Sequence, residues 1–180
     1  MVANKLNSEI RQVPDNQEVY LSTSGFTSLT IDLCERVTST ATDADALSYH
    51  FDDVVAEGDS KQIFKTDTST MLPKFPNVAV LQLLATVTPP SPDLRPPRAN
   101  TPTYVVIFLA LIRLELQMTD VVVTLNMPNI PVSQELVSAG EDVDFGQGMF
   151  GAAVAQGHEV LSEVLQSLEI KDWGLFGPGG

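Results

Sequence analysis

The sequence predicts an α+β domain in which a mostly antiparallel sheet is covered by helices. Strand-like alternation stands on both sides of one early helical pattern, and a second helical pattern comes late. The connections between successive strands are short, which favours antiparallel neighbours. With 180 residues and 43% hydrophobic content, the chain is large enough for one domain with a buried core. We expect a single domain over residues 1–180.

The first expected elements are a turn and two strands. In the segment RQVPDNQEVY, residues 11–20, Pro14 fixes φ, and the Asp-Asn pair that follows suits turn positions. Alternation then predicts strands over Glu18–Ser22 and Ser28–Val37, joined by a Gly-containing connection of hairpin length. We expect these two strands to pair with each other.

A helix is expected over Asp43–Ala56, ending near Gly58. Thr42 is a good N-cap, acidic residues occupy the first turn, and apolar residues recur at spacings of three and four. His50 on this helix is interpreted as a residue hydrogen-bonded to backbone or solvent, in preference to a catalytic group. Asp52 and Asp53 lack the glycine and glutamate spacing of a calcium loop and fit a solvated helix face.

Further strands are expected over Gln62–Phe64, Asn77–Val87, Tyr104–Gln117 and Asp120–Met127, the last two paired across a tight connection at Met118 and Thr119. The proline-rich segment 88–102 lies between the strands Asn77–Val87 and Tyr104–Gln117. It predicts an exposed loop, since proline donates no backbone hydrogen bond. We interpret it as a hairpin extension, although a proline-rich ligand for an aromatic groove is an alternative.

An irregular stretch, 126–148, precedes the last expected helix, Phe150–Leu168. This helix has one apolar face, and Gly157 is expected to weaken its middle. The face comprises Val154, Val160, Leu161, Val164, Leu165 and Leu168.

Charge and composition narrow the classes of partner. The 23 acidic and 10 basic residues give a formal net charge of −13, which repels nucleic acid and anionic lipid and suits a basic protein partner. The same balance also keeps an ordinary domain soluble. Tyr104–Ile112 is an apolar run too short to insert across a membrane, and no signal or transit peptide is indicated. The single Cys34 is expected to be a buried, inert thiol in a reducing compartment.

No motif for phosphate binding, serine hydrolysis or zinc proteolysis occurs, and no metal or cofactor is expected. The carboxylates that stand out are Asp32 and Glu35 near the end of a predicted strand. Strict alternation places Asp32 on one face with Cys34, and turns Glu35 inward with Leu33 unless a bulge or the strand end rotates it. Acidic residues at such a place either protect a sheet edge or contact a partner.

Four segments in a fixed order carry a family resemblance. These are the 11–20 segment, YHFDDV at 49–54, LIRL at 111–114 with TDVVVTLN at 119–126, and LFGP at 175–178. Together they resemble the Ran guanine nucleotide release factor family, the Mog-type proteins that bind the small GTPase Ran. The resemblance covers nearly the whole chain from Arg11. It implies an α/β/α sandwich of the kind shared with the PsbP proteins of photosystem II.

The resemblance also implies a function. Asp32 and Glu35 match an Asp-Leu-Leu-Glu motif of the Ran-binding surface, with Cys34 in place of the second leucine. Asp15 and Glu18 match the neighbouring turn and extend the acidic surface, although Asp15 can also be read as a structural turn residue. The implied protein is a monomeric, non-enzymatic factor that releases guanine nucleotide from Ran, acts in nuclear protein transport and resides in nucleus and cytoplasm. A Ran-binding protein is a further candidate partner in a ternary complex.

One feature departs from the family pattern. Family members carry a Leu-Phe-Gly-Gly-Ala-Ile strand before the turn, whereas Met1–Ile10 is unrelated to it. We expect Met1–Ile10 to be poorly ordered and a sheet edge to be left open, which favours self-association at high concentration. The alternatives to a Ran-binding protein are a PsbP-like photosystem II accessory protein and an unrecognised small enzyme on the same scaffold.

Overall fold

The computed structural model describes residues 13–23, 25–68, 72–76, 78, 80–90, 102–130 and 151–176. Six strands form one sheet with the order β1-β2-β6-β5-β4-β3, and every neighbouring pair is antiparallel. The strands are β1 (Gln17–Leu21), β2 (Ser28–Glu35), β3 (Ser60–Thr68), β4 (Val80–Thr88), β5 (Tyr104–Leu114) and β6 (Thr119–Asn129). The helices are α1 (Asp43–Val54), α2 (Gly151–Ser167) and the short 3-10 helix η5 (Trp173–Phe176).

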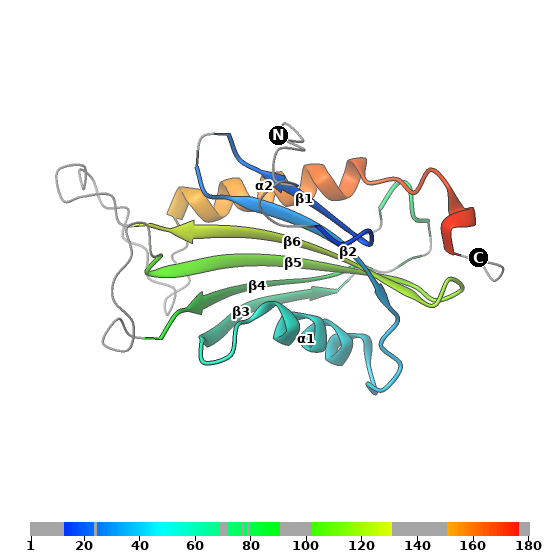
Figure 1. The fold of residues 1–180 in the computed structure, drawn as a ribbon, viewed down its shortest axis with the longest axis horizontal. Helices are drawn as coiled ribbons and strands as arrows, with labels where there is room; N and C mark the ends of the chain where they lie inside the picture. Colours follow the sequence, from blue (N-terminus) through cyan, green and yellow to red (C-terminus); the bar gives the residue numbers. More distant parts are fainter. Residues whose placement is uncertain are drawn as a thin grey trace.

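The two long helices cover opposite faces of the sheet, α2 on one side and α1 on the other (Figure 1). Leu161 and Leu165 of α2 join one core cluster with Phe108 on β5. Leu47 and Phe51 of α1 join the other cluster, with the alternate residues of β4 and β5. Because β5 is buried on both faces, it reads as a continuous apolar run. The expected α+β class and the α/β/α sandwich are confirmed.

The helix α1 begins as the sequence predicts. The Thr42 hydroxyl accepts a hydrogen bond from the Asp45 backbone N–H, and the Asp45 carboxylate accepts one from the Thr42 backbone N–H, both at 3.1 Å. This reciprocal capping box satisfies two of the donors that a helix start leaves free. The helix ends at Val54, two residues before the predicted Ala56. No helix in the described part of the chain is long and apolar enough to cross a membrane.

Several predicted boundaries are wrong. The β3 strand spans Ser60–Thr68, far longer than Gln62–Phe64. β6 continues to Asn129, into the stretch predicted to be irregular. Pro128 is tolerated there because β2 pairs with β6 only as far as Asn126, which leaves β6 with one neighbour beyond that point. Residues 131–148 of that stretch, and residues 91–101 of the predicted proline-rich loop, lie outside the described residues.

Gly157, expected to weaken the middle of α2, is buried against the sheet. A Cβ atom built on it would lie 2.4 Å from the Phe108 ring and 2.6 Å from the Met127 sulfur. The missing side chain therefore lets α2 approach β5 and β6 closely.

Candidate functional site

The turn before β1 is fastened to the end of β2. The Gln17 backbone N–H donates to the Pro14 carbonyl at 3.0 Å, which closes the turn. Asn16 then holds both polar backbone groups of Leu33: its carbonyl accepts from the Leu33 N–H at 2.8 Å, and its side-chain amide donates to the Leu33 carbonyl at 2.9 Å. The turn that carries Asp15 is thus fixed beside the strand segment that carries Asp32 and Glu35.

Asp32 is half-buried on the α1 side of the sheet. It lies opposite Gln17 in the β1–β2 register, and the Gln17 side-chain amide donates to its Oδ1 at 2.5 Å. On the other side it lies opposite Val122, which belongs to the core cluster under α1. The neighbouring Cys34 shares this side. The carboxylate is therefore oriented by β1 and keeps part of its surface open.

The surroundings of the Cys34 thiol disfavour its ionisation. Burial raises its pKa to about 11, with further contributions from the charges of Asp32, Asp120 and Asp53. A thiol with so high a pKa stays protonated and unreactive at neutral pH. The thiol is half-buried rather than fully buried, and the prediction that it is unactivated agrees with this raised pKa.

Glu35 lies on the opposite side of β2 from Asp32. The β2–β6 register runs unbroken to the pair Glu35 and Thr119, so no bulge rotates it, and it shares a side with Leu33. That position does not bury it: Glu35 is exposed and Leu33 is 37% exposed, because the strand ends here. The two carboxylates thus flank the end of one strand.

Three of the four predicted residues lie at one end of β2, and Glu18 accepts a hydrogen bond within β1. Asp15 is exposed in the turn and lies, with Asp32 and Glu35, at the same end of β2. Glu18 is farther along β1, opposite Ile31, and accepts a hydrogen bond from the Tyr20 hydroxyl. That hydrogen bond, with burial and the Glu18 charge, raises the pKa of Tyr20. We therefore define the acidic strand end as Asp15, Asp32 and Glu35, with Glu18 peripheral to it.

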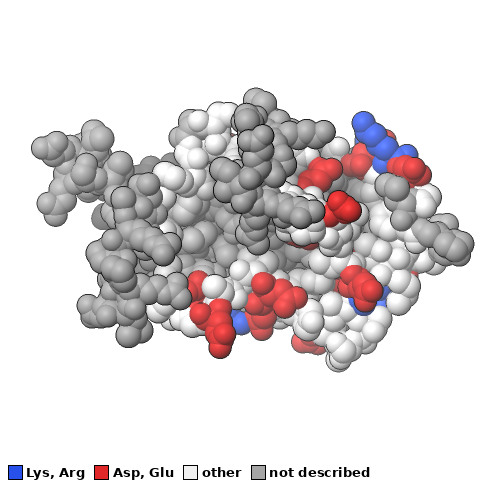
Figure 2. Space-filling view, in the orientation of Figure 1, with Lys and Arg blue, Asp and Glu red and all other residues white. Residues whose placement is uncertain are grey.

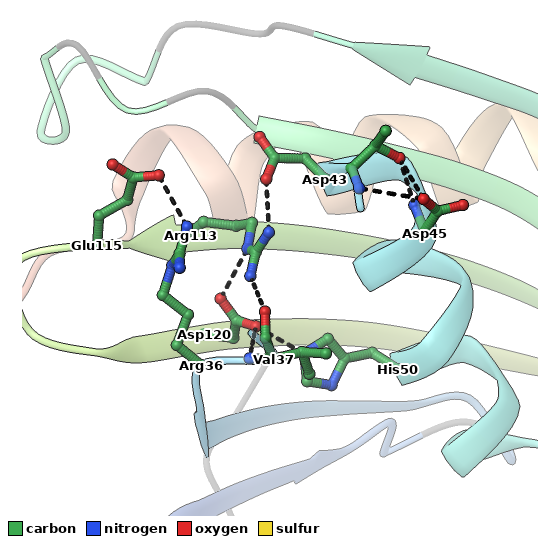
Figure 3. A network of polar contacts seen from close by, with 9 residues as sticks. Arg36, Val37, Asp43, Asp45, His50, Arg113, Glu115 and Asp120 are labelled. Atoms are coloured by element: carbon green, nitrogen blue, oxygen red, sulfur yellow. Dashed lines mark hydrogen bonds and ion pairs between the residues drawn. The ribbon is translucent and has the colours of Figure 1, made fainter. Parts of the chain in front are cut away.

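The β5–β6 turn borders the acidic strand end. The Arg36 backbone N–H donates to the Met118 carbonyl at 2.9 Å, and the Arg36 guanidinium pairs with Glu115 at 2.8 Å (Figure 3). Both contacts come from the residue that follows Glu35. The turn is thereby held directly against the end of β2.

A buried ionic network lies behind this surface (Figure 3). Asp120 on β6 has no exposed side-chain surface. It accepts hydrogen bonds from the Arg113 Nε and the Val37 backbone N–H, and the His50 Nε2 lies within hydrogen-bonding distance, each at 3.0 Å. Arg113 also donates to the Val37 carbonyl and pairs with Asp43 at the start of α1. The network joins β5, β6, α1 and the chain that leaves β2.

Asp120 and Arg113 keep their charges. Burial alone raises the pKa of Asp120, but hydrogen bonds from His50, Val37 and Arg113 together lower it below its ordinary value. Burial alone lowers the pKa of Arg113, but hydrogen bonds to Asp120 and Asp43 raise it overall. The expected backbone or solvent partner of His50 is wrong, since its partner is a carboxylate. Asp120, Arg113 and His50 are enclosed in protein, so we expect them to support the surface and not to contact a partner.

Arg113 and Asp120 lie in the segments LIRL and TDVVVTLN, but the sequence alone did not lead us to assign them a role. The signal was present: each is a single charged residue inside a near-continuous apolar strand, and the two lie opposite each other in the hairpin register. A buried charge needs a partner of opposite sign. Their pairing could have been inferred from that rule alone.

The surface around the site is acidic. Figure 2 shows carboxylates gathered over α1 and near β1, with few Lys or Arg side chains among them. Asp52 on α1 forms an ion pair with Lys61, while Asp45 is used in the helix cap. Within the residues described, no group of three or more His, Cys, Asp or Glu side chains could hold a metal ion.

Comparison with known proteins gives consistent matches. The model of the family described as Ran-interacting Mog1 protein matches residues 6–128. A Ran guanine nucleotide release factor of Danio rerio is 48% identical over 56 residues, which are 31% of this chain and 29% of that protein. The match thus spans under a third of that relative's length.

Solved structures match over almost the whole chain. The crystal structure of the Saccharomyces cerevisiae Ran-binding protein Mog1p has a TM-score of 0.66 and 24% identity, covering 95% of this chain and 87% of that chain. A point mutant of protein Mog1 has a TM-score of 0.65 and 23% identity, covering 95% and 88%. At this identity the likeness establishes the fold.

Proposed function

The chain belongs to the family of Ran-interacting Mog1 proteins, and from this premise we propose that it binds the small GTPase Ran and promotes release of its guanine nucleotide. The observation that carries the proposal is the match to the family model, which includes the turn, β2 and the β5–β6 turn. The matched Danio rerio segment bears the name of a release factor. In this role the protein acts in nuclear transport and resides in nucleus and cytoplasm.

The proposed mechanism needs binding alone and no bond-making step. If the protein binds nucleotide-free Ran more tightly than loaded Ran, linkage requires that it lower nucleotide affinity by the same factor. This is the behaviour of a binding protein and not of an enzyme. A Ran-binding protein that stabilises the same nucleotide-free form would join in a ternary complex. One monomer of the chain presents the whole proposed surface.

The acidic strand end is the proposed contact. Asp32 and Glu35 flank the end of β2, and Asp15 is fixed beside them by Asn16. Carboxylates in this arrangement suit Lys or Arg side chains of a partner through charge-assisted hydrogen bonds. Glu18 contributes less, because Tyr20 occupies its carboxylate and it lies farther along β1. The net charge of −13 further favours a basic face of Ran.

The release assay tests the function. Ran loaded with a fluorescent guanine nucleotide is mixed with the protein, and loss of signal is followed with time. We expect the protein to accelerate the loss in proportion to its concentration until binding saturates. If the rate equals the intrinsic rate at every concentration, the proposed function is wrong.

The substitution Asp32→Lys tests the site. It replaces attraction by like-charge contact, so Ran binding should weaken by about 2 kcal/mol or more, roughly 30-fold in Kd. Asp67→Lys is the matched control, because it makes the same change in net charge on exposed β3, at the opposite edge of the sheet. Equal Kd values for both folded variants would remove Asp32 from the site.

A further inference from the structure

The β5–β6 turn exposes two large apolar side chains. Leu116 is 81% exposed, the highest value among the described large apolar residues, and Met118 is 56% exposed. A single exposed leucine is ordinary on a protein surface. Two such residues within the four-residue turn Glu115–Met118 are not, since short turns between strands favour Gly, Asn, Asp and Ser.

The backbone of the turn is also unfavourable for its sequence. Met118 has a φ of 50°, and it is the one residue other than glycine with positive φ among those described. That conformation suits glycine or asparagine, and a longer side chain adopts it at a cost in conformational energy. The Arg36 backbone N–H donates a hydrogen bond to the Met118 carbonyl and so helps to hold Met118 in this conformation. Strain that stability alone does not explain is typical of functional positions.

The two apolar side chains are continuous with the acidic strand end. Glu35 lies opposite Thr119, the residue that follows the turn, and Arg36 is bonded to the turn at Met118 and Glu115. Figure 1 shows the β5–β6 turn at the same end of the sheet as the end of β2. Glu115 is itself exposed beside the pair. An apolar centre with a charged rim is the usual anatomy of a protein interface, and methionine is enriched in such centres.

We propose that Leu116 and Met118 are the apolar anchors of the surface that binds Ran, with Asp15, Asp32 and Glu35 as its acidic rim. This inference rests on the proposed function and adds the chemistry of the partner's contact. The complementary face of Ran is an apolar depression bordered by Lys or Arg side chains. The charges of the rim select the partner, and insertion of the two side chains slows its dissociation.

The test uses two variants of the turn and one control. Met118→Asn places a residue suited to positive φ at position 118, so its unfolding midpoint in urea should equal or exceed that of the unchanged protein. Leu116→Ala removes the other side chain without altering backbone preference. Phe26→Ala is the control, because Phe26 is 60% exposed in the β1–β2 connection, at the other end of β2.

Each variant is titrated against nucleotide-free Ran, and its mass is followed by sedimentation velocity. We expect both turn variants to bind at least about tenfold more weakly, while Phe26→Ala binds normally and all three stay folded. If the unchanged protein binds Ran and the turn variants bind equally well, the inference is wrong and the proposed function stands. If the unchanged protein does not bind Ran, both are wrong. If the turn variants abolish a dimer and keep their affinity for Ran, Leu116 and Met118 contact a second copy of this chain, and the inference is overturned.

Discussion

Asp120 shows how one buried carboxylate can position a surface that it does not reach. Its side chain is fully enclosed, and its contacts run to Arg113, to His50 and to the Val37 backbone. Val37 follows Glu35 and Arg36 along the chain, so these contacts fix the direction in which the chain leaves β2. The exposed acidic strand end therefore depends on an enclosed ionic network.

Asp120→Asn should destabilise the protein by about 3–5 kcal/mol, because it leaves the enclosed Arg113 charge without its main counterion. Urea unfolding at pH 7 measures the loss. Glu163→Gln on the exposed side of α2 is the matched control and should change stability by less than about 0.5 kcal/mol. An equal, small effect of both substitutions would show that the network contributes nothing to folding.

The pH dependence of this loss has a definite sign. The pKa of Asp120 lies below its ordinary value of 3.8 in the folded protein, so its carboxylate stabilises the fold above that value. The stabilisation disappears as pH falls from about 4 through the lowered pKa. The difference in unfolding free energy between the unchanged protein and Asp120→Asn should therefore shrink below about pH 4. A difference that stays constant down to pH 2 would contradict the assignment.

At the scale of residues, local patterns predict some features of the acidic strand end and not others. The turn at Pro14 and the shared face of Asp32 and Cys34 could be predicted because turn chemistry and strand alternation are local. The exposure of Glu35 could not, since alternation alone places it inward and only the end of the strand leaves it open. His50 and Asp120 are separated by 70 positions, and no local pattern reports such a pair.

At the scale of elements, the contact between α2 and the sheet depends on an absent side chain. Gly157 faces the ring of Phe108 on β5 and the sulfur of Met127 on β6. In an isolated helix, alanine would be preferred there by about 1 kcal/mol. Here helix propensity and packing oppose each other, and the closeness of the aromatic ring decides the outcome.

Gly157→Ala should therefore destabilise the protein, by about 1–2 kcal/mol after the gain in propensity, because the new methyl group forces the helix away from the sheet. Gln156→Ala, on the exposed side of the same helix, gains propensity without a clash and should be neutral or stabilising. Thermal or urea unfolding of both variants is the measurement. A Gly157→Ala protein more stable than the parent would mean that the Phe108 ring and Met127 adjust freely.

The strand β3 shows why one element was predicted too short. Exposed polar residues fill it, namely Lys61, Gln62, Lys65, Thr66 and Asp67, and even Ile63 is 45% exposed. As an edge strand, β3 pairs with β4 alone, and its register shifts between Ile63 and Lys65. The alternation of apolar and polar residues is therefore interrupted in the middle of β3, and the sequence pattern predicts only part of the strand. Buried β5 and β6 could be predicted because burial on both faces makes them apolar throughout.

At the scale of the whole molecule, sheet order decides which residues meet. β2 pairs with β6, although α1 and three other strands lie between them in the sequence. The sequence predicts the hairpins β1–β2 and β5–β6 because their connections are short, but nothing local states that one hairpin lies beside the other. That adjacency brings the β5–β6 turn to the acidic strand end. The structure alone shows this adjacency.

The outer edge of β1 is one of the two edges of the sheet, β3 forming the other. No strand in the described part of the chain pairs with that edge, and Leu21 on β1 is 37% exposed. The predicted disorder of Met1–Ile10 lies outside the described residues and stays a prediction. Unpaired edge groups favour contact between copies, whereas a net charge of −13 opposes it by repulsion. The two effects respond oppositely to salt, because salt screens only the repulsion.

We therefore expect a monomer at low concentration that self-associates as concentration rises, and does so more strongly at about 0.5 M salt than at about 0.05 M, where the Debye length is longer. Light scattering against concentration at both salt levels measures this. Leu21→Lys places a charge on the edge and should reduce the association, as should a version that carries the family's Leu-Phe-Gly-Gly-Ala-Ile leader. If all three proteins are equally monodisperse at both salt levels, residues 1–12 already protect the edge, and the predicted open edge is wrong.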